Sequence, residues 1–174
     1  MTQTVIVLIV KDTGNVLATV TRAGDPASAP SAADLAGERF PIRDGGGETI
    51  VEVPAEALDA KAVPLVDDLL LHPQMCGVQD DAATLLPSAD TVKVKLEKDG
   101  VTIAAAGTVT AETAVLVRLE SGAGETRRRD VLTDKIAAGD SDVTIHRTLT
   151  QPSYDFVAYI TGHIPLVKAD EAVT

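Results

Sequence analysis

The chain has 174 residues, the length of one ordinary domain, and 45% of them are hydrophobic, which excludes a globally disordered protein. Aromatic residues make up only 2% and tryptophan is absent, so the core is expected to be aliphatic. The single cysteine excludes a disulfide within the chain, and the net charge of −11 disfavours binding to nucleic acid or to an anionic membrane.

The N-terminal segment predicts a buried β-hairpin. Residues 4–10, TVIVLIV, are apolar at every position after the first, which is typical of a strand that is covered on both faces. Turn residues follow, and an apolar segment returns at 16–22. The apolar run is too short to span a membrane and no basic signal-peptide region precedes it, so we expect a soluble, cytoplasmic protein without membrane insertion.

The segment after this hairpin predicts a short helix, a loop and a strand. Ser31 is suited to cap a helical turn over about 31–37, which would end at Gly37. The glycine-rich loop at 45–47 leads into a predicted strand at 49–54 rather than into a helix. A flexible turn is therefore predicted at this loop, and not a phosphate-binding loop.

A second short helix is predicted at 64–72, PLVDDLLLH. Proline fits the first helical position, and Leu65, Leu69 and His72 would share one side of the helix. The helix is expected to end before Pro73, because a proline disfavours helical geometry in the residue that precedes it.

The candidate metal ligands of the chain are His72, Cys76, Asp80 and Asp81. Thiolate and imidazole suit copper or zinc, and clustered carboxylates suit calcium. However, the chain has no second cysteine and no paired histidine, its ligand order is not that of a blue-copper site, and its carboxylates lack the spacing of an EF-hand. We therefore predict no metal site and no cofactor, with Cys76 filling a gap in the core.

The segment 92–105 carries the clearest strand signal in the chain. Apolar residues alternate with charged ones up to Glu97, and Asp99 with Gly100 predicts a type I′ turn before the chain returns. Further strands are predicted, in chain order, at 113–121, 141–150 and 154–167. The last of these is expected to break near Gly162.

Strands recur every ten to fifteen residues, and long helical periodicity is absent. This pattern predicts an all-β fold, mainly an antiparallel β-sandwich or barrel, with one or two short helices at about 31–37 and 64–72. We expect a single β-rich domain over residues 1–174. A division into two lobes near 87–90 is the alternative.

Charge is distributed unevenly along the chain. Residues 44–90 contain ten acidic residues and a single basic one, Lys61, whereas the run TRRRD is the one concentrated basic segment. This run is predicted to be a solvated loop, or alternatively a patch that docks on the acidic segment of a neighbouring copy. The candidate interaction residues are Arg127, Arg128, Arg129, Asp67 and Asp68.

No motif in the chain indicates catalysis. Gly139-Asp140-Ser141 resembles the nucleophile block of GDS-type esterases, but no D-x-x-H and no G-x-S-x-G occurs. We therefore expect a non-catalytic structural subunit of a larger assembly, analogous to phage, tail or shell subunits, that contacts copies of itself or other subunits. The alternatives are a β-sandwich module that binds a small ligand or metal ion, and a hydrolase without a recognisable motif.

Overall fold

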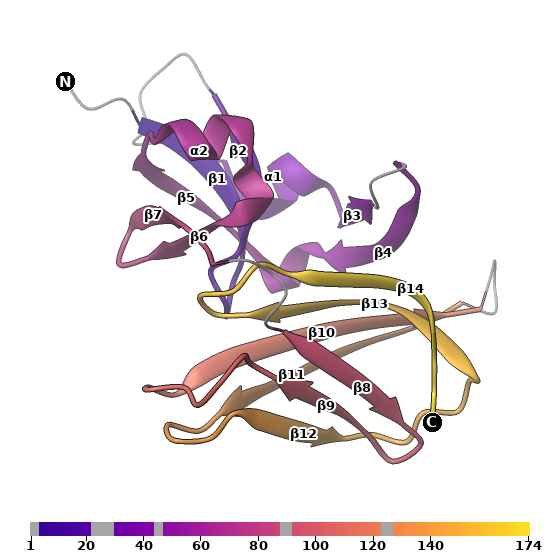
Figure 1. Cartoon of the computed structure of the whole chain (residues 1–174). Coiled ribbons are helices and arrows are strands. Elements are labelled where there is room, and N and C mark those ends of the chain that lie inside the picture. The colour runs from indigo at the N-terminus through magenta and orange to yellow at the C-terminus, as the bar shows by residue number, and fades with distance from the viewer. Residues whose placement is uncertain (1–3, 22–29, 44–46, 88–91, 123–126) are drawn as a thin grey trace.

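The computed structural model consists mainly of β-strands in several antiparallel sheets, with two short α-helices (Figure 1). It describes residues 4–21, 30–43, 47–87, 92–122 and 127–174. The prediction of an all-β fold is confirmed, although the described strands form separate sheets and not one closed barrel. Within these residues, no helix has the length and apolar character that crossing a membrane requires.

We call residues 4–87 the N-terminal lobe; the predicted division near 87–90 lies, apart from Pro87, outside the described residues. Its elements are β1 (Thr4–Val10), β2 (Val16–Val20), α1 (Ala32–Ala36), β3 (Arg39–Arg43), β4 (Thr49–Pro54), η2 (Ala55–Ala57), β5 (Leu58–Pro64), α2 (Asp67–Leu71), η3 (Pro73–Met75), β6 (Cys76–Gln79) and β7 (Ala82–Leu85). They form a three-stranded sheet in the order β2-β1-β5 and the two hairpins β3-β4 and β6-β7.

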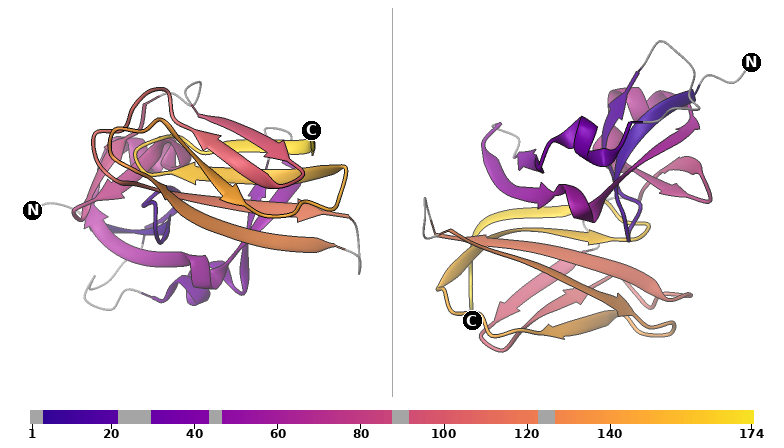
Figure 2. Two further views of the ribbon diagram at one scale, coloured as in Figure 1. Left: turned by 90° about the horizontal axis from the view of Figure 1, so that it is seen from below. Right: turned by 180° about the vertical axis from the view of Figure 1, so that it is seen from behind.

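Residues 92–174 form the C-terminal lobe, a sandwich of two antiparallel sheets (Figures 1 and 2). Its strands are β8 (Lys93–Glu97), β9 (Gly100–Ala104), β10 (Thr113–Ser121), β11 (Arg128–Ile136), β12 (Asp142–His146), β13 (Ser153–Ile160) and β14 (Leu166–Ala172). The sheet β11-β10-β13-β14 faces the sheet β12-β9-β8 across an aliphatic core that also contains Tyr154 and Phe156.

Strand β1 is apolar on both faces because each face packs into a different core. Val5, Val7 and Ile9 lie in the core of the N-terminal lobe. Leu8 and Val10 alternate with them and lie in a second core, which the N-terminal lobe shares with the C-terminal sheet. Since successive side chains of a strand point to opposite faces, burial on both sides requires the continuous apolar run seen in the sequence.

The shared core between the lobes places the β3-β4 hairpin across the outer face of the sheet β11-β10-β13-β14 (Figure 1). Val51 and Val53 of β4 pack there with Leu116 of β10 and with Val157 and Tyr159 of β13. The same strands β10 and β13 send their alternate residues into the core of the sandwich. The hairpin therefore sits between the two lobes and borders the pockets described below.

The second helix begins later than predicted. Pro64 is the last residue of β5, where it pairs with Thr4, and α2 runs from Asp67 to Leu71. Val66 occupies the N-cap position, and its side chain makes no capping hydrogen bond. The pairing with β1 thus extends β5 through the proline, which is tolerated because β5 is the edge strand of its sheet.

The turn between β8 and β9 differs from the prediction by one residue. Glu97 pairs with Gly100, so Lys98 and Asp99 are the central residues, and neither has a positive φ. Gly100 belongs instead to β9, where an added Cβ would lie 2.9 Å from the carbonyl oxygen of Ile145. Glycine is required here for the close approach of β12 and not for the turn.

The predicted helix cap at Ser31 is confirmed. Ser31 Oγ accepts a hydrogen bond from Asp34 N at 3.2 Å, and Asp34 Oδ2 accepts one from Ser31 N at 2.9 Å, which forms a capping box. The hydrogen bonds from Ser31 lower the pKa of the Asp34 carboxyl. The stability that this carboxylate contributes is therefore present above its unfolded pKa and is lost as the pH falls through its lowered folded value.

Replacing Ser31 with alanine is expected to lower the free energy of unfolding by about 1 kcal/mol at pH 7 because the N-cap is lost. The difference between the wild type and the variant should shrink at a second, more acidic pH below the lowered folded pKa of Asp34, where protonation of this carboxyl weakens the capping box in the wild type. Urea denaturation followed by circular dichroism at the two pH values measures this difference. An equal difference at both would contradict the role of Asp34.

Candidate functional site

A cluster of charged side chains lies where the β3-β4 hairpin meets the C-terminal lobe. It comprises Arg39, Glu52, Arg118, Glu120, Arg127 and Arg129, and we call it the inter-lobe cluster. Charged side chains are rarely buried unless they are paired, so this cluster is the most unusual polar feature in the described part of the chain.

Strand geometry brings these side chains together. Arg118 and Glu120 are two residues apart on β10 and therefore point to the same face of the sheet. Glu120 lies directly opposite Arg129 of β11, an arrangement in which cross-strand neighbours of opposite charge attract each other. The outer face of β10 and β11 thus presents alternating charges to the hairpin above it.

Glu120 is the centre of the cluster and is completely buried. Its Oε1 lies 3.5 Å from Arg118 Nη2, and its Oε2 forms ion pairs with Arg127 Nη2 and, at 3.6 Å, with Arg129 Nε. The contacts to Oε2 lack hydrogen-bond geometry, so the attraction there is mainly Coulombic. One buried carboxylate is therefore in ion-pair contact with three guanidinium groups, from β10, from β11 and from the residue that precedes β11.

Glu52 of β4 connects the hairpin to this centre. Its backbone N–H donates to Glu120 Oε1 at 2.7 Å, and its carbonyl oxygen accepts from Arg118 Nε at 2.9 Å. Its carboxylate Oε2 accepts from Arg129 Nη2 at 2.9 Å and lies 3.5 Å from Arg39 Nη1. The two lobes are thus joined here by hydrogen bonds as well as by the shared apolar core.

Burial affects the ionisation of the cluster. It lowers the pKa of the Arg118 guanidinium, an effect that the neighbouring Glu120 carboxylate opposes. Arginine nevertheless remains a cation at neutral pH. Four arginines face two glutamates in the cluster, so Glu120 is essential to the charge balance around Arg118.

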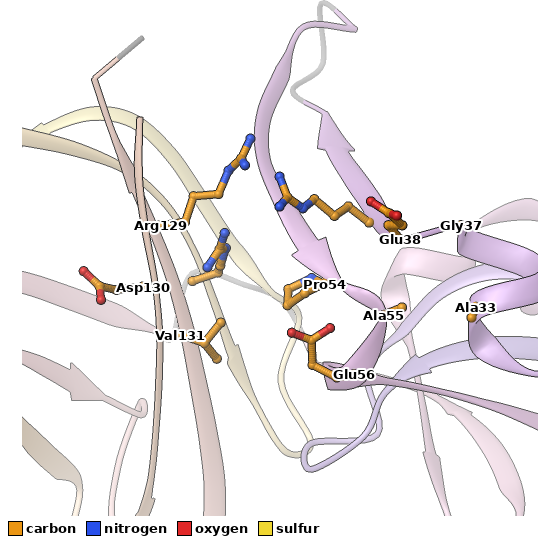
Figure 3. A pocket seen from close by; sticks show the side chains of 11 residues that line it. Ala33, Gly37, Glu38, Pro54, Ala55, Glu56, Arg129, Asp130 and Val131 are labelled. Atoms are coloured by element: carbon orange, nitrogen blue, oxygen red, sulfur yellow. The ribbon is translucent and has the colours of Figure 1, made fainter. Parts of the chain in front are cut away.

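An open pocket of about 840 Å³ lies beside the inter-lobe cluster (Figure 3). Its lining residues are Ala33, Gly37, Glu38, Arg39, Pro54, Ala55, Glu56, Arg118, Arg129, Asp130 and Val131. In Figure 3, Arg129 and Val131 border it on one side and Glu56 on the other, whereas Asp130 points away. Asp130 accepts instead from Arg147 Nη2 at 2.7 Å.

The chemistry of this pocket is ionic. The side chains that line it present guanidinium and carboxylate groups, but no hydroxyl, thiol or imidazole. They can bind a charged group of a partner or ligand, yet they lack the hydroxyl–imidazole or thiol–imidazole pair on which nucleophilic catalysis commonly depends. The arrangement is thus better suited to joining two parts of the structure and to binding than to acyl transfer.

The predicted basic run is not a loop along its whole length. Arg128 and Arg129 belong to β11, and Arg127 directly precedes it. Arg127 and Arg129 turn toward the inter-lobe cluster, where their guanidinium groups pair with Glu120 and Glu52. Arg128 is exposed, and its Nη1 contacts Thr150 Oγ1 at 3.3 Å. Two of the three arginines are therefore engaged in ion pairs within the chain.

The four candidate metal ligands follow one another along α2, η3 and the β6-β7 hairpin but do not converge. His72 is exposed, whereas Cys76 is buried in the core of the N-terminal lobe and its Sγ–H donates to the backbone oxygen of His72 at 3.7 Å. Asp80 and Asp81 form the β6-β7 turn, both with positive φ, and are exposed. Among the described residues, no group of three or more His, Cys, Asp or Glu side chains is arranged to hold a metal ion.

The acidic interaction candidates lie in the first turn of α2, where Asp67 is exposed and Asp68 is half-buried. Sequence reasoning missed the residues at the centre of the cluster, Glu52, Arg118 and Glu120. The sequence does indicate two of them, because Arg118 and Glu120 occur within the otherwise mainly apolar strand TAVLVRLES. Charges on an apolar strand indicate a buried ion pair.

No protein-family model, no curated protein and no solved structure matches this chain.

Proposed function

We propose that the protein is a non-catalytic structural subunit of a larger protein assembly, in which it contacts copies of itself or other subunits. The observation that supports this most directly is the position of the exposed apolar side chains. Among the described residues there are four large ones, and three of them lie within a short stretch of the N-terminal lobe: Leu70, Leu71 and Leu85, at 49%, 69% and 55% exposure.

Helix α2 has three consecutive leucines, and the N-terminal lobe covers only one of them. Successive residues of a helix are about 100° apart, so Leu69, Leu70 and Leu71 span roughly 200° of the helix surface. Only Leu69 is buried. Neighbouring exposed leucines form an apolar patch of the kind that protein contacts cover, and covering these two contributes about 1.5–3 kcal/mol each. The exposed side of α2 therefore has the character of an interface.

The charge around α2 restricts what can cover it. Asp67 and Asp68 are in its first turn, and the turn Asp80-Asp81 belongs to the same acidic lobe, where Lys61 pairs with Asp81 at 3.2 Å. Two identical acidic faces repel each other, so a symmetric contact between copies through this surface is disfavoured. We infer a contact between unlike surfaces, which closes into a ring or continues as a filament.

Light scattering of the purified protein over a range of concentrations tests this proposal. The wild type is expected to show a mass of several times 18.1 kDa. The double variant Leu70→Ser/Leu71→Ser should shift this mass toward that of one chain, because the apolar surface of α2 is removed.

The matched control for this experiment is Val131→Ser. Val131 is the fourth exposed large apolar residue, at 39%, but it lies on β11 of the other lobe. We expect it to leave the mass of the assembly unchanged. A wild-type protein that remains a single chain at every concentration, or an equal effect of both variants, would contradict the proposal.

A further inference from the structure

The exposed face of α2 combines one carboxylate with two leucines. Asp67, Leu70 and Leu71 are all exposed, and their spacing of three and four residues places them side by side on one face of the helix. A surface that receives this face in a contact between copies needs apolar side chains for the leucines and a cation for the aspartate. It also needs to lack carboxylates of its own, because like charges repel each other.

A second pocket of the chain has this composition. It lies between β3 and the strands β13 and β14, with a volume of about 430 Å³. Its lining residues are Val16, Leu17, Phe40, Pro41, Ile42, Arg43, Gln74, Val157, Tyr159, Ile164, Pro165 and Val167. Nine of these twelve are apolar, none carries a carboxylate, and the one charged residue is an arginine. The lining therefore matches the exposed face of α2 in both apolar character and charge.

Arg43 is placed to act as the cation. It is the last residue of β3 and is exposed, and its Nη1 donates to the Gly47 carbonyl oxygen at 2.7 Å. A guanidinium group carries five N–H donors, so this contact leaves others that can donate to a carboxylate of a neighbouring copy.

The larger pocket beside the inter-lobe cluster matches α2 less well. Its lining includes Glu38 and Glu56 as well as arginines. These carboxylates would repel Asp67 of an incoming helix. Leucines placed among the charged groups would also remove water from them, which is costly unless each charge keeps a partner. The apolar pocket is therefore the better receptor for α2.

The exposed face of α2 and the apolar pocket are separated within one copy. Thr19 Oγ1, near the end of β2, donates to the Leu69 carbonyl oxygen at 2.8 Å, so α2 lies at that end of the strand. Val16 and Leu17, at the start of β2, line the pocket. Figure 1 likewise shows α2 on the part of the N-terminal lobe that lies away from β13 and β14. Contacts between a helix and a pocket can therefore repeat from copy to copy, head to tail.

We propose that α2 of one copy docks into the apolar pocket of the next copy. This proposal rests on the proposed function and names the two surfaces that meet in the assembly. Leu70 and Leu71 lie against the apolar lining, and the Asp67 carboxylate accepts hydrogen bonds from the exposed Arg43 guanidinium. The buried leucines supply most of the free energy of binding, and the ion pair sets the orientation of the helix.

Mixing two variants tests this docking. Leu70→Ser/Leu71→Ser removes the apolar surface of the helix and keeps the pocket, whereas Ile42→Trp fills the pocket from its half-buried position on β3 and keeps the helix. Each variant alone is expected to have the mass of one chain. An equimolar mixture offers one intact helix and one intact pocket per pair of chains, so light scattering should show a two-fold higher mass and no larger species.

The outcomes separate this docking from the proposed function. If the wild type assembles but the mixture keeps the mass of one chain, the docking is overturned and the proposed function stands. A wild type that is a single chain contradicts both. An Ile42→Trp protein that assembles as the wild type does would also overturn the docking, and would leave the pocket to a small molecule.

Exchanging the two charges gives a second test that does not depend on the folding of Ile42→Trp. Arg43→Asp and Asp67→Arg are each expected to raise the protein concentration at half-assembly about ten-fold, because each brings like charges together. The double variant should return this concentration to near the wild-type value. Arg128→Asp is the matched control, since Arg128 is also exposed but lies on β11 of the other lobe. No recovery in the double variant, or an equal effect of the control, would overturn the docking.

Discussion

Replacing Glu120 with glutamine is expected to lower the free energy of unfolding by about 3–5 kcal/mol, the range found when one partner of a buried ion pair is removed. The substitution keeps the shape of the side chain and still lets the Glu52 N–H donate to an oxygen. However, it leaves the buried Arg118 without the carboxylate that compensates its charge. Urea denaturation followed by circular dichroism measures the change.

Glu112→Gln is the control for this prediction. The Glu112 carboxylate pairs with Lys135 Nζ at 2.6 Å, a shorter distance than any between Glu120 and Arg118, but both side chains are about 60% exposed. Exposed pairs contribute little to stability, so this variant should unfold at the same urea concentration as the wild type. An equally small effect of Glu120→Gln would show that burial does not increase the contribution of this charge to the free energy of unfolding.

The effect of Glu120→Gln should reach both lobes. Glu52 belongs to the hairpin of the N-terminal lobe, whereas Arg118 and Arg129 belong to the C-terminal sheet, and all three contact Glu120 or one another. Val51 and Val53 flank Glu52 in the shared apolar core. A change at the ion pairs therefore disturbs the packing on which both lobes depend, and the two lobes are expected to unfold in one transition.

Local patterns predicted much of the sheet structure. The expected strands at 49–54 and 113–121 match β4 and β10 at both ends, and the break expected near Gly162 separates β13 from β14. These segments were predictable because β-branched and apolar residues dominate them and turn residues border them. The hairpin from 4–10 to 16–22 was predictable for the same reason and is confirmed by the pairing of β1 with β2.

Strands without a regular pattern were not predicted. β5, LDAKAVP, has no strict alternation of buried and exposed residues, and it forms because it pairs with β1 along its whole length. β11, RRDVLTDKI, is an edge strand in which polar residues dominate, so its sequence is typical of a loop. In both strands the pairing with an apolar neighbour determines the structure, and a local pattern does not contain that information.

The candidate site was less predictable than the fold because its contacts join residues far apart in the chain. Arg129 and Glu52 are separated by 77 positions, and Glu120 and Glu52 by 68. The three arginines of the basic run are adjacent in sequence, a pattern that predicts a solvated loop or a surface patch. On a strand, alternate residues point to opposite faces, so Arg129 turns inward while Arg128 remains exposed.

Replacing Gly14 with alanine is expected to lower the free energy of unfolding by about 3 kcal/mol or more. Gly14 lies in the turn between β1 and β2 with a φ of +72°, a conformation that costs other residues about 1–2 kcal/mol. In addition, an added Cβ would collide with the backbone carbonyl oxygen of Val78, which cannot rotate away as a side chain can. The same turn holds β6 through a hydrogen bond from Val78 N to Gly14 O at 2.8 Å.

Gly162→Ala separates the two causes. Gly162 has a similar φ of +80°, but an added Cβ would meet no atom within 4 Å, so this variant should show only the conformational cost of about 1–2 kcal/mol. The excess loss in Gly14→Ala then measures the collision with Val78, and hence how rigidly the β6-β7 hairpin is held against the first turn. Equal losses in the two variants, measured by urea denaturation, would mean that this contact yields easily and does not fix the hairpin.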